Sequence, residues 1–212
     1  MSTINLSCPV CQHKSQKDMI TYIDTSKNPE LVGKLLMNEL YFFECSNCGA
    51  KRQLEVQMVF HDPEEKVLLI NLANQDYTEK LKDNLMKYIP SNFDLSDYDL
   101  RLVRNIPELV EKIQILQFGK ASDSIIEIVK LLTDGLFMKQ KPDAQILNRF
   151  FTIAKGAPKI YYILEDEQFF VDYNDSLQEF AEEKYKKAAK ETPKGEFITV
   201  NQKWAVNLLE GK

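Results

Sequence analysis

Four cysteines carry the only spacing in this 212-residue chain that predicts a specific chemistry. They form two Cys-x-x-Cys pairs, Cys8 with Cys11 and Cys45 with Cys48, and they are all the cysteines of the chain. Two thiolates at this spacing can bind one ion, and two such pairs complete the four-sulfur shell of a structural Zn²⁺ site. The sequence therefore predicts a structural zinc ion bound by these four residues. The same ligands suit iron, so the identity of the metal stays open.

The residues around each pair favour a tight turn. Pro9 fixes φ in the first pair and has no N–H. Gly49 follows the second pair, where a residue free to take positive φ lets backbone N–H groups turn toward the sulfurs. Gln12 stands at the equivalent place in the first pair, so we expect a less favourable geometry there.

A four-thiolate site leaves no coordination position for water, so it does no Lewis-acid chemistry. Its contribution is to folding, because it joins two segments that lie far apart in the chain. A thiol redox switch is an alternative use of the pairs. Redox Cys-x-x-Cys motifs lie between a strand and a helix in a βαβ unit, and neither pair has that context here.

The two histidines are weaker candidates. His13 lies two residues after Cys11, but four cysteines already complete a zinc shell, so we expect it in a solvated loop. His61 precedes Asp62, a pairing typical of catalytic partners, but we expect both in a turn over residues 61–66 between two strands. The sequence thus identifies no catalytic residue and no residue that would bind an organic cofactor.

Aromatic doublets motivate an alternative function. Phe150-Phe151, Tyr161-Tyr162 and Phe169-Phe170 place one ring on each face of a predicted sheet. Uncovered rings could line the pocket of an enzyme whose active site lies in the C-terminal domain, away from the metal. The chain contains no glycine-rich phosphate loop, no nucleophile elbow and no His-Glu-x-x-His motif, so a non-catalytic role is favoured.

Charge and hydropathy argue against two classes of partner. The net charge of −5 disfavours binding to nucleic acid or to an anionic membrane, and Lys51-Arg52 alone support a nucleic-acid role of the ribbon. No apolar run reaches the ~18 residues of a transmembrane helix, and the first residues do not form a signal peptide. We therefore expect a cytoplasmic protein.

Helical and strand-forming segments indicate an α+β fold in three parts. Residues 1–74 should form a zinc ribbon with an inserted helix from Asn28 to about Leu40 and a β-hairpin over 54–72. Residues 75–97 should form a helix followed by a linker from Pro90. Residues 98–212 should form an α+β domain with an antiparallel helix pair and an antiparallel β-meander.

The cysteine segments and their surroundings resemble the CpXC family, a bacterial and archaeal group. The similarity is carried by Cys8-Pro9-Val10-Cys11, by Asn28-Pro29-Glu30-Leu31 and by Phe42-Phe43-Glu44-Cys45-Ser46-Asn47-Cys48-Gly49. Ser46 stands where the family has a second proline. The resemblance implies a metal site at the cysteines, and it implies no particular activity or substrate.

These observations lead to one hypothesis about function. We expect a zinc-binding protein that acts as a binding or interaction module, with the metal in a structural role. Its partner would be another protein or a second copy of the chain, because the edge strands of the C-terminal sheet need covering. The sequence identifies no small-molecule ligand.

Overall fold

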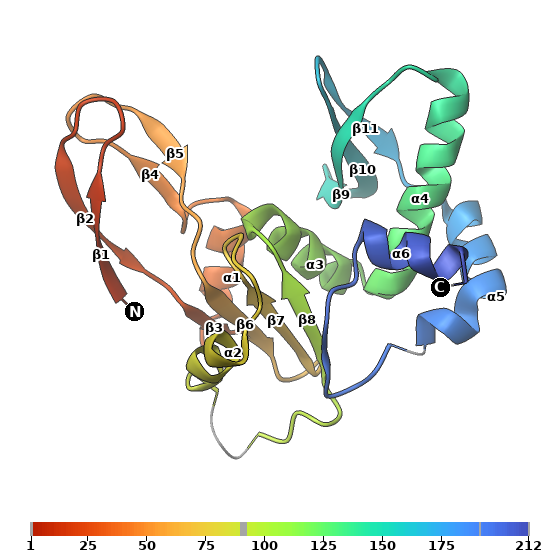
Figure 1. Cartoon of the computed structure of the whole chain (residues 1–212), viewed down its shortest axis with the longest axis horizontal. Helices are drawn as coiled ribbons and strands as arrows, with labels where there is room; N and C mark the ends of the chain where they lie inside the picture. Colours follow the sequence, from red (N-terminus) through yellow and green to blue (C-terminus); the bar gives the residue numbers. More distant parts are fainter. Residues whose placement is uncertain (1, 90–92, 191, 212) are drawn as a thin grey trace. The chain divides into compact units, whose positions relative to one another are not determined.

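The computed structural model describes residues 2–89, 93–190 and 192–211 and has a mixed α+β architecture, as predicted (Figure 1). The chain forms two compact units. The first contains the residues up to Leu109 together with Lys194–Ile198, and the second contains Val110–Pro193 together with the residues from Thr199 onward.

Two antiparallel hairpins begin the first unit. Strands β1 (Ser2–Ser7) and β2 (Lys14–Met19) form one, and β4 (Phe42–Glu44) and β5 (Lys51–Gln53) form the other. Figure 1 shows them side by side, in red and orange. The ammonium of Lys17 joins them by donating to the carbonyl of Phe42 at 2.5 Å.

Helix α1 (Pro29–Leu36) separates the two hairpins in sequence and ends four residues before the predicted Leu40. Asn38 adopts a φ of 61°, its N–H donates to the carbonyl of Leu35, and the N–H of Glu39 donates to the carbonyl of Lys34. This is the Schellman arrangement, in which a left-handed residue turns the chain back over the last helical carbonyls. The apolar residues up to Leu40 do not reveal this stop, because asparagine is not the usual residue for it.

A five-stranded mixed sheet forms the body of the first unit, in the order β12-β8-β7-β6-β3. Strands β6 (Met58–Asp62) and β7 (Val67–Asn71) are an antiparallel hairpin. The other neighbours pair in parallel, namely β3 (Tyr22–Asp24) with β6, β8 (Asp99–Val103) with β7, and β12 (Phe197–Ile198) with β8. All five residues of β7 are buried, as expected for a central strand that is covered on both faces.

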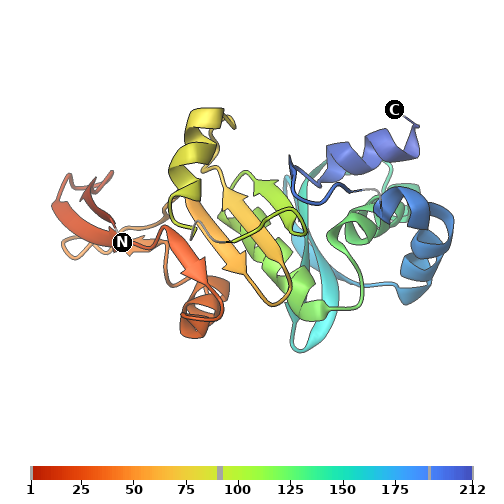
Figure 2. The same ribbon diagram turned by 90° about the horizontal axis from the view of Figure 1, so that it is seen from below.

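Helix α2 (Glu79–Met86) connects β7 to β8 and covers one face of this sheet. Leu85 of the helix and the following Ile89 pack with Val59, Leu68 and Leu100 of the strands. Figure 2 shows α2 and α1 on opposite faces of the sheet. Thr78 caps α2, because its side chain accepts a hydrogen bond from the N–H of Leu81.

The compact units differ from the expected segments 1–74, 75–97 and 98–212. Strands β8 and β12 lie in the sheet of the first unit, although both belong to the expected C-terminal segment. Hydrophobic alternation identifies a strand, but it does not show which strand pairs with it. Residues 90–92 of the expected linker lie outside the described residues.

The second unit places helices against a three-stranded antiparallel sheet, in the order β11-β10-β9, at the position of the expected meander. The strands are β9 (Ile146–Ala154), β10 (Ala157–Leu164) and β11 (Gln168–Asp172), and the helices are the larger part of α3 (Ile106–Phe118), α4 (Asp123–Gln140), α5 (Asp175–Lys190) and α6 (Gln202–Leu209). The backbone of α4 lies closest to α5 and α6. Helix α3 meets α4 through side chains, with Ile115 of α3 in one core cluster with Ile126 of α4 and Glu111 of α3 2.6 Å from Lys130 of α4.

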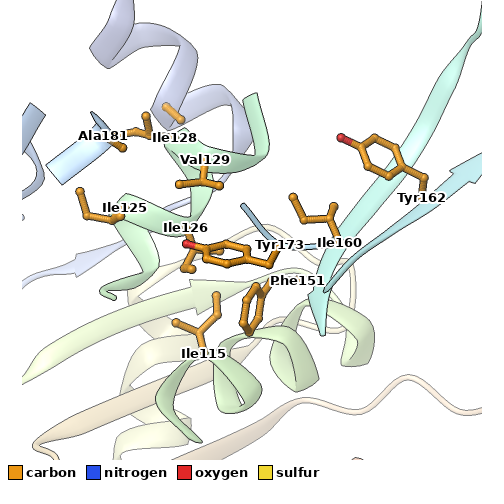
Figure 3. Packing of buried hydrophobic residues seen from close by; sticks show 11 residues of the cluster. Ile115, Ile125, Ile126, Ile128, Val129, Phe151, Ile160, Tyr162, Tyr173 and Ala181 are labelled. Atoms are coloured by element: carbon orange, nitrogen blue, oxygen red, sulfur yellow. The ribbon is translucent and has the colours of Figure 1, made fainter. Parts of the chain in front are cut away.

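The core of the second unit is built from both layers. Figure 3 shows Ile115 of α3, Ile126 of α4 and Phe151 of β9 gathered around the ring of Tyr173. Phe151 meets Tyr173 edge-on, with 5.5 Å between ring centroids. Among the helices that the structure describes, none has the length and apolar character needed to span a membrane.

Candidate metal centre

The four cysteines converge in space, although 33 residues separate the two pairs. All four sulfur atoms lie within 4.8 Å of one another, with 3.6 Å between Cys8 and Cys48 and 3.7 Å between Cys11 and Cys45. Sulfurs bound at ~2.3 Å to one tetrahedral Zn²⁺ stand about 3.8 Å apart. The arrangement therefore fits a four-coordinate metal ion, and within the described residues no other group of cysteine, histidine and acidic side chains comes together in this way.

Each Cys-x-x-Cys pair lies in a turn, here called a knuckle, and the two knuckles have the same backbone hydrogen bonds. In the first, the N–H of Cys8 donates to His13 and the N–H of Gln12 donates to Cys8, both at 2.9 Å. In the second, Cys45 donates to Ala50 and Gly49 donates to Cys45, both at 2.8 Å. Each knuckle closes the end of a hairpin, where Ser7 pairs with Lys14 and Glu44 pairs with Lys51. Two equivalent turns thus present four sulfurs to one point.

Backbone N–H groups point at the sulfurs and stabilise thiolates. The N–H groups of Cys11 and Val10 lower the pKa of the Cys8 thiol. The Asn47 side chain, from the opposite knuckle, and the N–H of His13 lower the pKa of Cys11 to about 6. Against the lowering effect of the Ala50 N–H, the neighbouring sulfurs of Cys11, Cys8 and Cys45 raise the pKa of Cys48 to about 12. Four thiolates this close therefore need a cation among them to be charged together.

Burial differs among the four cysteines. Cys8 and Cys45 are 1 % and 2 % exposed, Cys11 is partly buried and Cys48 is exposed. The exposed side does not open a coordination position, because the four sulfurs already complete a tetrahedron. Val10, between the first two ligands, is 72 % exposed at the tip of its turn.

The equivalent turns differ at one residue, as the sequence predicts. Gln12 has a φ of 60° and Gly49 has a φ of 70°, so the first knuckle holds a glutamine in the left-handed region that favours glycine.

Replacing Gln12 with glycine should therefore stabilise the ribbon by about 1 kcal/mol, because it removes the strain of a side chain in this region. Gly49→Ala should destabilise it by a similar amount, although a Cβ there meets no atom within 4 Å. Hydrogen exchange of the β1 and β4 amides measures both effects. Equal protection in Q12G, G49A and the unchanged protein would show that neither turn is strained.

The chain matches one known family. The family described as CpXC protein matches residues 6–130, which is more than half of the 212 residues. The chain belongs to the CpXC family. The matched segment contains both knuckles and continues through most of the first unit into α4. No curated protein and no solved structure shows a significant match to the chain.

The remaining candidates from the sequence take other places. His13 is exposed, with Nε2 3.4 Å from the Ser46 hydroxyl, and is not among the clustered ligands. Lys51 pairs with Glu44 at 3.3 Å, and Arg52 lies over the ring of Phe43. Of the aromatic doublets, Phe151 and Tyr162 are buried in the core of the second unit. Phe150, Tyr161 and Phe170 stand opposite one another on the other face of the meander.

A second polar cluster, around His61, was not predicted. The expected turn over residues 61–66 is too long, because β6 runs through Asp62 and places His61 inside the sheet at 0 % exposure. His61 Nδ1 lies 3.0 Å from the Tyr22 hydroxyl and Nε2 lies 3.3 Å from the Tyr98 hydroxyl. Tyr22 donates in turn to Asp24, which pairs with His61 across β3 and β6.

The hydrogen bonds of this cluster define the neutral tautomer of His61. A carboxylate only accepts, so the single hydroxyl proton of Tyr22 goes to Asp24. Nδ1 of His61 then donates to the Tyr22 oxygen, and Nε2 accepts from Tyr98. A run of four side chains, from strands β3 and β6 and the loop before β8, is satisfied in this way. Sequence spacing could not have shown it, because its members come together only when β3 and β6 pair in parallel.

Acid should destabilise the first unit through His61. Burial lowers the pKa of His61 below its ordinary value of 6.5, so the unfolded chain binds a proton at a higher pH than the folded chain. The stabilising difference is fully present above 6.5 and is lost as the pH falls below it. Hydrogen exchange of the β6 and β7 amides between about pH 5 and 7.5 measures this, with at most a tenfold change in opening per pH unit.

Two histidine variants separate this effect from general acid sensitivity. His61→Gln should remove the slope, whereas His13→Gln, at an exposed position, should keep it. A slope of equal size in H61Q and in the unchanged protein would contradict the assignment to His61.

Proposed function

We propose that this CpXC protein is a binding module whose N-terminal ribbon is held by a structural zinc ion at Cys8, Cys11, Cys45 and Cys48. The observation that carries the proposal is the convergence of four sulfurs, from two equivalent turns, at the spacing of a closed tetrahedral site. A bound Zn²⁺ would supply folding energy and no open position for a substrate. The protein would then bind its partner through the surfaces of its two units, the first of which includes the ribbon.

The two hairpins contain too little apolar surface to be stable alone. Besides Cys8 and Cys45, their buried hydrophobic residues are Leu6, Met19 and Phe43. Small domains with so few core residues depend on a metal, disulfides or a partner. A shared zinc ion joins the hairpins at their tips, and this supports a structural role over a catalytic one.

Electrostatics favours a protein partner over nucleic acid. The two hairpins carry four basic residues, Lys14, Lys17, Lys51 and Arg52, and two acidic ones, Asp18 and Glu44. Four thiolates around Zn²⁺ add a net charge of about −2, so the loaded ribbon is close to neutral. Nucleic-acid binding needs a positive surface, and Lys51 and Arg52 are already engaged with Glu44 and Phe43.

Metal analysis of the purified full-length protein tests the proposal. We expect one zinc per chain by elemental analysis. Replacement by Co²⁺ should give the strong thiolate charge-transfer absorption of a tetrahedral four-sulfur site, which distinguishes it from a site with three sulfurs and a water. Finding iron in place of zinc would support the proposed four cysteine ligands and correct only the identity of the metal. A metal-free protein with an intact ribbon, shown by protected amides in β1 and β4, would overturn the proposal.

A further inference from the structure

Charged side chains lie together in the interior of the second unit. Glu111 and Lys112 of α3, Glu127 and Lys130 of α4 and Arg149 of β9 are each at most 5 % exposed. Asp123 and Asp134 at the two ends of the group are 13 % and 14 % exposed. A buried charge is tolerated when it is paired and hydrogen-bonded, and it is costly otherwise. Each of these buried charges therefore needs a partner of opposite charge.

Two of the cations have a carboxylate of their own. Arg149 Nη2 lies 2.8 Å from Asp134, which also accepts a hydrogen bond from the Tyr162 hydroxyl at 2.8 Å. Lys112 Nζ lies 3.2 Å from Asp123 and donates to the carbonyl of Val200 at 2.7 Å.

The third cation faces two carboxyl groups. Lys130 Nζ is 2.6 Å from Glu111 Oε1 and 3.0 Å from Glu127 Oε1. The next cation, Lys112, is 3.6 Å from Glu127 and closer to Asp123. Lys130 is thus the nearest cation to Glu111 and to Glu127 among the ion pairs of this cluster.

Glu111 and Glu127 differ in the hydrogen bonds that their carboxyl oxygens accept. Glu111 Oε1 also accepts a hydrogen bond from the backbone N–H of Phe151 at 2.6 Å. Glu127 Oε2 is buried and has no hydrogen-bond partner among the described residues, in a side chain that is 2 % exposed. Nε and Nη2 of Arg149 likewise make no hydrogen bond there, although Nη2 is ion-paired with Asp134. An ionised carboxylate with one oxygen in that position would be poorly compensated.

We propose that Glu111 and Glu127 form a binding site for one proton. The folded second unit holds this proton at low pH and releases it as the pH rises. One carboxylate of the pair binds H⁺ and becomes a neutral carboxylic acid, and the other remains ionised beside Lys130. The pair holds the proton jointly, because the two groups share one ammonium. The bound proton removes one negative charge from the two groups that share Lys130.

The surrounding groups favour this protonation state. Burial raises the pKa of Glu111, against the opposing effect of Lys130. Although burial alone would lower the pKa of Lys130, Glu111 and Glu127 raise it, so the ammonium stays charged. The titratable and charged groups that face the pair are Lys112 of α3, Asp123, Lys130 and Asp134 of α4, Arg149 of β9 and Tyr162 of β10.

The site makes the stability of the second unit depend on pH in a defined direction. A carboxyl group with a raised pKa in the folded state stabilises most below its ordinary value of 4.5 and loses that contribution as the pH rises through the folded pKa. Releasing one proton on unfolding changes the unfolding equilibrium constant by about tenfold per pH unit in that window.

The test uses Trp204, the single tryptophan of the chain, which packs against the core of the second unit. Urea unfolding of the full-length protein is followed by its fluorescence at several pH values above about 4.5. The unchanged protein should lose stability by about tenfold per pH unit. Glu111→Gln should flatten this slope, because a neutral amide replaces the protonated acid. Glu179→Gln, at an exposed position of α5, should keep it.

Two further measurements keep the proposal open to refutation if E111Q does not fold. Glu127→Gln leaves Lys130 with one carboxylate in the same way and should flatten the slope equally. Infrared spectra of the unchanged protein should show the carbonyl band of a protonated, buried carboxylic acid, and this band should disappear as the pH rises. Equal slopes in E111Q or E127Q and the unchanged protein, or the absence of that band, would overturn it.

Discussion

Replacing Cys45 with serine should unfold the zinc ribbon and leave the second unit folded. In small zinc domains the binding of the metal supplies roughly 10–16 kcal/mol, and this energy is also the energy of folding. The two hairpins, β1–β2 and β4–β5, have Leu6, Met19 and Phe43 as their only described buried apolar residues other than cysteine, so their core cannot replace that contribution. Loss of one buried ligand should therefore abolish zinc binding and the protection of the β1, β2, β4 and β5 amides.

The control for this prediction lies in the opposite knuckle. Val10→Ser changes an exposed side chain between Cys8 and Cys11 and should leave both the metal content and the protection unchanged. Trp204 fluorescence should show the same unfolding transition of the second unit in C45S, V10S and the unchanged protein. Retained zinc in C45S, or ribbon amides protected without metal, would contradict the prediction.

Replacing Lys130 with methionine should destabilise the second unit by about 3–5 kcal/mol near neutral pH, the usual cost of removing one partner from a buried ion pair. Lys130 is the shared cation of Glu111 and Glu127, so its loss leaves two buried carboxyl groups without their nearest positive charge. Methionine fills a similar volume, which keeps the effect largely electrostatic.

Urea unfolding followed by Trp204 fluorescence measures the change in the free energy of unfolding. Lys139→Met is the matched control, because Lys139 is exposed near the end of the same helix and should change stability by less than about 0.5 kcal/mol. Acid should reduce the defect of K130M, since protonated carboxyl groups no longer need the cation. A loss of equal size in K139M, or no loss in K130M, would contradict the electrostatic explanation.

Local interactions explain the parts of the fold that could be predicted. The start of α1 at Asn28-Pro29 and the cap of α4 at Ser122 depend on residues within one helical turn. The left-handed φ of Gln12 follows from its position in the knuckle, equivalent to Gly49. The pairing of strands that lie far apart in the chain could not be predicted in this way. Nothing in the sequence of β12 indicates that it leaves the second unit and pairs with β8.

The two buried polar clusters escaped prediction for a related reason. His61, Asp62 and Pro63 have the local sequence of a turn. Pairing of β6 with β3 and β7 nevertheless extends that strand through His61 and Asp62. Glu111, Lys112, Glu127 and Lys130 have the sequence pattern of solvated helix faces. Only the packing of α3 and α4 against β9 shows that these charges are buried and that Glu111 and Glu127 share Lys130.

By itself, the amino-acid sequence predicted which four residues would come together, because two Cys-x-x-Cys pairs suit a single metal ion. It also indicated the α+β class and the CpXC family, through residues close together in the chain. The tertiary structure alone decided that the four sulfurs meet at one point, that His61 is surrounded by tyrosines and that Lys130 lies between two glutamates. Each of these depends on segments far apart in the chain being brought together, and their proximity is a property of the folded chain as a whole.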